Sequence, residues 1–577
     1  RAARAASSTP LMLAASRSGA TRSARSPAAA RAALLLLLLA GDAAALAARF
    51  PGLPPRPPLC RQCRAAPPRL VGDRSVDVPL DTAEAAVAAG TAAPAAAAAA
   101  DEPACRIGGA QGDCVGQTSA GAMTINLSKN IVGSGVLSLS AGIAACSGSA
   151  GAMAPAALLL LLIGGVSAYS FSLLARVGEE NGTGSYRETW AKLFGERSAR
   201  LVDATIVIEC MCAAVSFAII IGDTFSAVAA LCGAPPPLLR PNAWIVALSA
   251  LVLLPLCLLR DLGSLAFGSV LGTGGTLFTA GFMLFRALDG SYAPGGRFFG
   301  ALGEAGRPHF GGGSSAGPLS ACILVSLVAN AFLAHYNAPT MYRQLAPPPR
   351  AGASAKLALF NRVVAGGFGL ACLVSAAMMT AGFATFGAAS GGLILNNYAV
   401  GDSLATLARL GVGLSIIFSY PLNFVGLREG LLSLLGWQAR AARRTVHAGA
   451  TVLLLGAMNG TQTPLPPSTC ALRESERHPT RPLAPESIGL ALVVKDLGAL
   501  AAFSGAIVGS ALIYVFPAAM FLQSARRRRA REFVVEAGTG AGALPRIKRR
   551  EVAANWMLGG LGVVLAVVGG AVAAKGW

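Results

Sequence analysis

The residues best suited to bind a small molecule lie at positions 126–140, NLSKNIVGSGVLSLS, inside an apolar segment that runs from about 123 to 145. Gly133 and Gly135 flank Ser134 there, and two glycines so close together favour a break in a helix. At membrane depth a break is tolerated where its free N–H and C=O groups line a cavity and find partners. Secondary transporters bind substrates and ions at such breaks. The alternative is a helix-packing face of small residues.

Composition places the chain in a membrane. Of its 577 residues, 54% are hydrophobic and 13% are charged, and the mean hydropathy is +0.59, values that a soluble domain rarely combines. The net charge of +20 comes from Lys and Arg that sit in short loops between apolar segments, where they indicate topology rather than nucleic-acid binding. We therefore expect an all-α integral membrane protein with no nucleic-acid partner.

About eleven segments are predicted to be transmembrane helices, most of them near the ~20 residues that cross a hydrocarbon core. They lie at about 123–145, 152–175, 201–232, 243–259, 262–286, 319–337, 363–386, 403–426, 445–456 joined to 488–495, 498–522 and 553–575. Lys and Arg concentrate after the second, sixth, eighth and tenth segments, whereas the alternate loops are nearly bare, with Arg240, Arg297 and Arg307. By the positive-inside rule the N-terminus is cytosolic and the C-terminus lies on the other side.

Two stretches do not fit this pattern. The ninth span is interrupted by residues 457–487, which are rich in Pro, Ser, Thr and charge; we interpret them as an insertion, either a gene-model error or a disordered excursion. Residues 1–117 are rich in Ala, Arg, Ser and Pro and predict a disordered region, either a targeting presequence or a coding-frame artefact. The transmembrane domain is expected to be 118–577.

Signatures of enzymes and metal sites are not found. The sequence has no P-loop, HExxH or GxSxG motif, which argues against a pump or a membrane hydrolase. Cys60 and Cys63 form a lone CxxC without a second pair, and cysteines within the spans are small apolar fillers. We expect a protein that is not an enzyme, has no cofactor and holds no metal.

Five runs, in order, resemble the amino acid/auxin permease family, especially its neutral amino acid transporters. They are NLSKNIVGSGVLSLS, ANAFLAHYNAPTMYRQL at 329–345, GFATFG at 382–387, LSIIFSYPLNFVGLREG at 414–430 and GALAAFSGAIVGSALIYVFPAAMFL at 498–522. Phe332 and His335 are in register with a signature of that family's sixth span. The resemblance covers about residues 120–577 with one insertion. It implies two inverted five-helix repeats plus one further helix, a broken first and sixth helix, and alternating access around a midplane site.

The resemblance also implies a substrate site. Its residues are Val132, Gly133, Ser134 and Gly135 of the first span, Asn330 and Phe332 of the sixth, and Ser415 and Ser419 of the eighth. A free amino acid fits there, because its carboxylate would accept N–H groups at the break, its ammonium would meet free carbonyls, and its side chain would pack near Phe332. For the two serines, the alternative is helix packing or bonding to their own helix.

Lys129 departs from the sodium-coupled members of that family, which place a small or amide residue at the equivalent position near the ion. An ammonium there would occupy the sodium position, and a buried Lys needs a counter-charge, for which Glu209 is the candidate. Together with His335, the third expected ion-coupling residue, this pair favours proton coupling over sodium coupling. The alternative is that Lys129 snorkels to the cytosolic interface and Glu209 bonds a neighbouring helix.

Other function classes stay open. A membrane amino acid sensor would bind the substrate without transporting it, and a channel is disfavoured because eleven unequal spans hold no filter-like loop. We expect a secondary active transporter, a symporter whose partners are a neutral amino acid, a proton or sodium ion, and the lipid bilayer. The particular amino acid, the oligomeric state and the membrane (plasma membrane, vacuole or other endomembrane, or plastid envelope) are left open by the sequence.

Overall fold

The computed structural model describes residues 116, 118–259, 266–311, 320–348, 353–437, 440, 443–460, 497–536 and 548–574. These residues are mainly helical, and their only β pairings are two isolated bridges, Thr118 with Leu345 and His309 with Gly387. The predicted disordered region 1–117 lies outside the described residues apart from Gly116. Of the predicted insertion 457–487, only 457–460 is described.

The first span is broken, as predicted. Helix α2 (Ala120–Ile131) begins after Ser119, whose hydroxyl accepts a hydrogen bond from the N–H of Ala122. It ends at Val132, and the chain resumes as the 3₁₀ helix η1 (Ser134–Ser138) and then α3 (Leu139–Cys146). The two halves are bent by 46°, so the Gly-Ser-Gly run does interrupt the helix.

The sixth span is broken as well. Helix α10 (Ala321–Ala331) stops at Phe332, and residues 332–334 are not helical. The chain continues as a turn of 3₁₀ helix, η9 (His335–Asn337), and a short helix, α11 (Ala338–Gln344), with Pro339 in its first turn. Proline suits that position because its missing N–H has no partner inside the helix. The predicted break in the sixth helix is therefore confirmed.

Helices occupy the described parts of the other predicted spans, whereas 262–265 and 488–495 lie outside the described residues. The long ones are α4 (Met153–Asn181), α6 (Glu196–Leu231), α9 (Ala266–Leu288), α12 (Ala353–Phe386), α13 (Ser403–Leu434), α15 (Arg444–Gly460), α19 (Phe516–Glu536) and α20 (Arg549–Val564). The shorter ones are α5 (Tyr186–Phe194), α7 (Pro241–Leu248), α8 (Leu254–Leu258), α18 (Leu497–Ser504) and α21 (Gly570–Ala574). Four π-helical turns connect neighbouring pieces: η4 (Ser249–Leu253), η11 (Gly505–Gly509), η12 (Ala511–Val515) and η13 (Leu565–Gly569).

Among the described residues, eight helices are long and apolar enough to cross a membrane, or nine with the bent first span. Helices α9 and α15, at the fifth and ninth predicted spans, are not among these nine. The all-helical membrane architecture is thus confirmed, whereas the number eleven and the inverted repeat stay predictions. The sequence predicts that the first half of the ninth span ends at Gly456, but helix α15 continues to Gly460.

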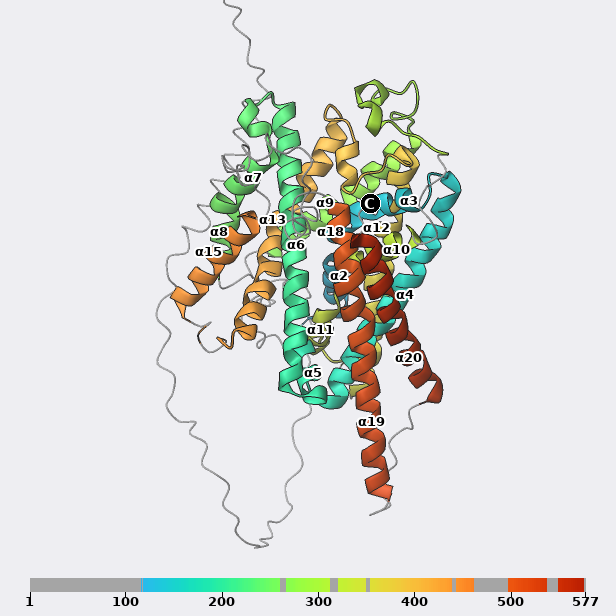
Figure 1. Ribbon diagram of the computed structural model, residues 1–577, viewed down its shortest axis with the longest axis vertical. Helices are drawn as coiled ribbons and strands as arrows, with labels where there is room; N and C mark the ends of the chain where they lie inside the picture. Colours follow the sequence, from blue (N-terminus) through green and yellow to red (C-terminus); the bar gives the residue numbers. More distant parts are fainter. Residues whose placement is uncertain are drawn as a thin grey trace, which may run out of the picture.

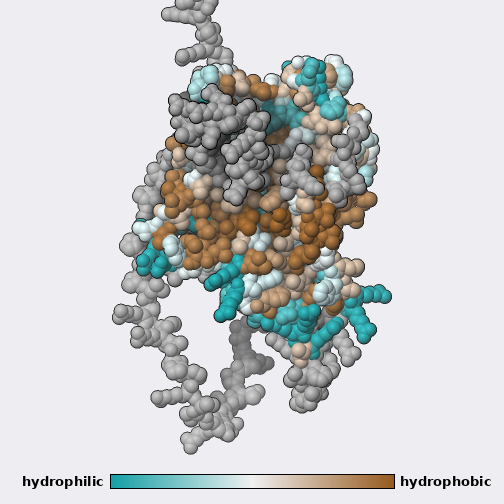
Figure 2. Space-filling model, in the orientation of Figure 1, coloured by the Kyte–Doolittle hydropathy of each residue, from teal (hydrophilic) through white to brown (hydrophobic). Residues whose placement is uncertain are grey.

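The helices form one bundle whose long axis follows α6 and α19 (Figure 1). Helix α13 packs against α6 and α9, and α12 packs against α2 and α4. A broad hydrophobic belt crosses the visible face, and polar side chains gather below it (Figure 2). Large apolar side chains such as Leu162, Leu453 and Met557 are more than half exposed. A belt of this kind is suited to lipid, because exposed apolar surface is unfavourable in water.

The ends of the two broken spans are joined on one side of the bundle. The N–H of Gly116 donates to the carbonyl of Arg343 at 3.1 Å, and the N–H of Thr118 donates to that of Gln344 at 3.0 Å. In return the carbonyl of Thr118 accepts from the N–H of Ala346 at 2.9 Å. The start of α2 and the end of α11 are therefore held together by backbone hydrogen bonds.

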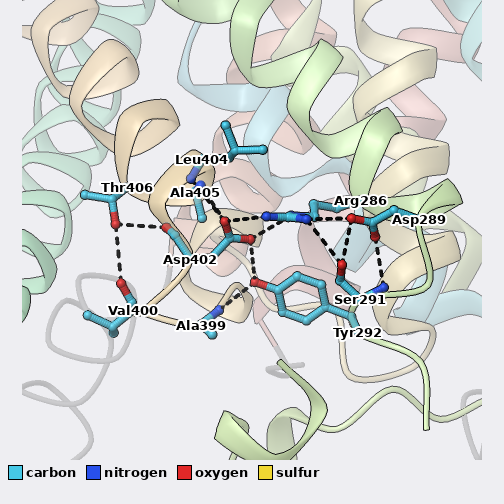
Figure 3. A network of polar contacts seen from close by, with 10 residues as sticks. All are labelled: Arg286, Asp289, Ser291, Tyr292, Ala399, Val400, Asp402, Leu404, Ala405 and Thr406. Carbon is cyan, nitrogen blue, oxygen red and sulfur yellow. Dashed lines mark hydrogen bonds and ion pairs between the residues drawn. The ribbon is translucent and has the colours of Figure 1, made fainter. Parts of the chain in front are cut away.

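A network of polar and charged groups joins the C-terminal end of α9 to the N-terminal end of α13 (Figure 3). Arg286 donates to both carboxylate oxygens of Asp402 at 2.8 Å, and the Tyr292 hydroxyl donates to the same carboxylate at 3.0 Å. Burial raises the pKa of the Tyr292 phenol above its ordinary value, so this group stays a neutral donor. Asp402 also caps α13, because its carboxylate accepts from the N–H groups of Leu404 and Ala405.

Candidate functional site

The break in the first span leaves open space at Gly133. This residue is exposed although it lies between two buried stretches, and a Cβ added to it would meet no atom within 4 Å. Its backbone is extended, with φ −107° and ψ −151°, a conformation that any residue adopts. Neither the backbone conformation nor a close neighbour thus requires a glycine at position 133, and the space beside it is open.

Gly135 has the opposite role, because it allows the two broken spans to touch. A Cβ on this buried glycine would lie 2.9 Å from Nδ2 of Asn330 and 3.1 Å from the Cα of Ala331. Such distances are shorter than carbon atoms tolerate without movement. The first span thus approaches the end of α10 through a glycine, and the breaks of the first and sixth spans lie side by side.

Several polar groups at this junction lack partners. The side chains of Ser134 and Asn330 are half-buried and have no hydrogen-bonding partner among the described residues. The N–H groups of Val132 and Gly133 donate to the carbonyls of Ser128 and Ile131, which leaves the carbonyls of Lys129 and Asn130 and the first N–H groups of η1 without partners in their own helices. These donors and acceptors, with the open space at Gly133, match the two charged groups of a small zwitterion.

Lys129 brings a positive charge to the same place. It lies in the last turn of α2, and its Nζ is buried without a hydrogen-bonding partner among the described residues. The predicted ion pair with Glu209 is not formed in this structure. Instead, Oε2 of Glu209 accepts a hydrogen bond of 2.7 Å from the hydroxyl of Ser504, because this face of α6 packs against α18.

Glu209 nevertheless connects to the break through α18. Ser504 is the last residue of α18, and Gly505 follows it in the π-helical turn η11. A Cβ on Gly505 would overlap the carbonyl oxygen of Ser326 and lie 2.9 Å from the Cβ of Asn330. The carboxyl group of Glu209 is thus linked by a short series of packed residues to the amide that touches Gly135.

His335 lies away from the opening. It is fully buried, and its Nε2 is 2.9 Å from both the hydroxyl of Ser170 and the carbonyl of Ser167. Its ring meets the edge of Phe171 with centroids 5.6 Å apart. His335 therefore contacts α4 and aromatic rings rather than Lys129 or Glu209. These contacts hold η9 against α4.

Phe332 is also core rather than lining. It is fully buried, its ring stacks on Phe368 with centroids 6.1 Å apart, and its tip lies against Gly164 of α4. A side chain without exposed surface does not border the open space at Gly133. The contacts of its ring in this structure are with Phe368 and Gly164, and its packing against the substrate stays a prediction.

Ser415 and Ser419 follow the alternative given for them above. The side chain of Ser415 packs against Gly272 of α9, and the hydroxyl of Ser419 donates to the carbonyl of Ser415 at 2.8 Å. Their recorded contacts are with α9 and with their own helix. The reason is the rotation of α13, which turns this face of the helix toward α9.

Sequence reasoning missed Ser504 and Gly505. Their signal was a serine followed by glycines at positions 505 and 509 in an otherwise apolar span, a small-residue spacing that permits close helix contact. Among the described residues, no cluster of three or more His, Cys, Asp or Glu side chains could hold a metal.

Comparison with known proteins gives a consistent result. The family model described as "Transmembrane amino acid transporter protein" matches residues 116–531. "Putative sodium-coupled neutral amino acid transporter 11" of Danio rerio is 26% identical over 419 residues, which cover 72% of this chain and 81% of that protein. The Mus musculus protein of the same name is 25% identical over 421 residues, covering 72% and 80%. A solved structure, "Inward facing conformation of Mhp1", is similar with a TM-score of 0.46 and 13% identity, covering 82% of this chain and 93% of that one.

Proposed function

The chain belongs to the transmembrane amino acid transporter protein family, and we propose that it carries neutral amino acids across a membrane by alternating access. The preference for neutral amino acids is supported by the relatives from Danio rerio and Mus musculus, which are named as putative neutral amino acid transporters. The observation that carries the proposal is the open break at Gly133, beside unpartnered side chains on both broken spans.

In this proposal the substrate binds at residues 132–135 and Asn330. The carboxylate accepts hydrogen bonds from the first N–H groups of η1 and from the hydroxyl of Ser134. The ammonium donates to the free carbonyls at the end of α2 and to the amide oxygen of Asn330. The proposal is limited to these residues, because the side chains of Phe332, Ser415 and Ser419 contact other parts of the bundle in this structure.

Proton coupling is the proposed energy source, with Glu209 as the group that takes up and releases the proton. A carboxyl group that is 8% exposed, with one hydroxyl partner, loses little by becoming neutral. The buried ammonium of Lys129 would stand where sodium-coupled relatives hold the ion. The second candidate is sodium coupling, which is favoured because the same relatives are named as sodium-coupled.

The test of transport is counterflow. Purified protein is placed in liposomes that are preloaded with an unlabelled neutral amino acid, and uptake of the radiolabelled compound is followed for a panel of such substrates. Transient accumulation above that of unloaded liposomes is expected, because a carrier exchanges one substrate molecule for another. A protein that binds the label but gives no counterflow would be a sensor, and the transport proposal would be wrong.

A further inference from the structure

A cavity lies away from the break, at the opposite end of α6 from helix α5. It has a volume of about 450 Å³, which is within the range of small-molecule sites. Its lining includes Ile219 and Asp223 of α6, Gly303, Asn396, Val400 and Leu497. Asp223 is 14 residues beyond Glu209 on the same helix, roughly 21 Å along its axis at about 1.5 Å per residue.

The cavity nonetheless adjoins the broken span. Three of the elements that line it, namely α6, α18 and the 3₁₀ helix η10 (Ile394–Asn397), each pack against η1. η1 is the piece of the first span that directly follows the open Gly133. The elements that line the cavity thus also contact the piece of the first span that follows the break.

The chemistry of the cavity favours an ammonium group. Asp223 is the one charged residue among the described residues that line it, and its Oδ2 accepts a hydrogen bond of 2.7 Å from the amide of exposed Asn396. The N–H of an ammonium binds a carboxylate more strongly than an amide N–H does, so it can replace the amide of this exposed side chain. Ile219 and Leu497 supply apolar surface for an uncharged side chain.

The guanidinium of Arg409 binds the backbone of the segment that carries Asn396. Arg409 is 2% exposed, and its Nη2 donates to the carbonyls of Leu395 and Tyr398 at 2.8 and 2.6 Å. Its Nε and Nη1 have no hydrogen-bonding partner within the described part of the chain. Arg409 does not itself line the cavity; it holds the turn η10, whose Asn396 contacts Asp223.

We propose that this cavity is a second, outer site for the zwitterionic amino acid, in which the substrate ammonium displaces the amide of Asn396 from the carboxylate of Asp223. The inference rests on the proposed transport function and deepens it. The substrate binds here first, on the face of the membrane that the cavity opens to, and then passes to the break. The outer site raises the local concentration of substrate on that face only.

The test compares KM for transport started from each face of the membrane. Asp223→Asn removes the charge, and we expect KM to rise about tenfold from the cavity's face, the loss of one charge-assisted hydrogen bond, with KM from the other face unchanged. Glu304→Gln is the matched control, since it removes an exposed carboxylate next to the cavity-lining Gly303, and it should change neither value.

A second pair of variants keeps the test decisive if Asp223→Asn does not fold. Gly303 and Gly300 both have open space where a Cβ would stand, but only Gly303 is among the described residues that line the cavity. Gly303→Trp should raise KM from that face alone, and Gly300→Trp should not. Unchanged KM in Asp223→Asn and Gly303→Trp, or equal changes from both faces, would overturn the inference. Absence of counterflow in the unmodified protein would instead overturn the proposed function.

Discussion

The guanidinium of Arg286 donates two hydrogen bonds of 2.8 Å, from Nε and from Nη2, to the carboxylate of Asp402. The carboxylate is fully buried, whereas the guanidinium is 11% exposed. Two parallel hydrogen bonds between planar groups fix orientation as well as distance. The contact therefore sets the end of α9 relative to the start of α13, next to the loop that carries η10.

Loss of this contact should destabilise the protein. Asp402→Ala leaves the Arg286 charge without its main partner and removes the cap of α13, and we expect a cost of about 3–5 kcal/mol. Asp289→Ala is the control, because Arg286 keeps both hydrogen bonds to Asp402, and it should cost only about 1 kcal/mol. Thermal denaturation in detergent, followed by tryptophan fluorescence, measures both. Equal melting temperatures for the two variants would contradict the importance given to Asp402.

The π-helical turn η11 offers a matched pair of glycines. Gly505→Ala would drive a methyl group into the carbonyl oxygen of Ser326, whereas a Cβ on Gly509 would meet its nearest neighbour, the Cβ of Ala329, at an ordinary 3.7 Å. We expect Gly505→Ala to lower stability by about 1–3 kcal/mol or more and Gly509→Ala to be neutral. Melting temperatures in detergent would reveal the difference, and a tolerated Gly505→Ala would show that α10 and η11 are not packed this closely.

The open space at Gly133 gives a test of the substrate site. A Cβ at Gly133 meets no atom within 4 Å, so we expect Gly133→Leu to fold and insert but, because it fills the open space, not to transport. Gly165→Leu, at an exposed glycine of α4 that also has free space, should transport normally. Counterflow together with size-exclusion profiles separates activity from folding. Normal transport by Gly133→Leu would remove the break from the substrate path.

Topology can be read from glycosylation. Asn181 stands in an NGT sequon, but its loop is predicted to be cytosolic, and its amide already donates to the carbonyl of Val177 at 2.8 Å. We expect no glycan there and a glycan on Asn459 if residues 457–487 are present in the mature protein. Glycosidase treatment of the protein from eukaryotic cells, with Asn181→Gln and Asn459→Gln for assignment, shows which asparagine is modified. A glycan on Asn181 would reverse the orientation.

Coupling can be tested at Glu209. If its carboxyl group carries the proton, uptake should rise as the external pH falls, because the proton gradient then drives the substrate inward, and replacing sodium with choline should have no effect. Glu209→Gln should lose the pH response, whereas Glu188→Gln, at an exposed carboxylate of α5, should keep it. Lys129→Asn should introduce sodium dependence by vacating the expected ion position.

Sodium is the competing outcome of that experiment. Strict sodium dependence of the unmodified protein, without proton current in a voltage-clamped membrane, would contradict proton coupling. Lys129 would then serve as a snorkelling residue and Glu209 as a structural partner of Ser504.

The helices and both breaks could be predicted because their signals are local. An apolar run of membrane length requires a helix, and paired glycines around Ser134 disfavour its continuation. Family resemblance extended the same information to the sixth span. The family match over residues 116–531 and the non-helical residues 332–334 confirm those predictions.

Side-chain partners could not be predicted in the same way. The partner of Glu209 is Ser504, 295 residues later in the chain, and only the rotation of α6 and α18 about their axes brings the two together. The same kind of rotation turns Ser415 toward α9. Helix rotation is decided by packing among many side chains, which no local pattern in one sequence encodes.

The backbone bridge between Thr118 and Leu345 has a mechanical consequence. Three hydrogen bonds tie the start of α2 to the end of α11, so the two half-helices on this side of the breaks share one degree of freedom instead of two. If the chain bends at Gly133 during transport, we expect residues 332–334 to bend with it. A single spectroscopic label on either half-helix would consequently report the movement of both.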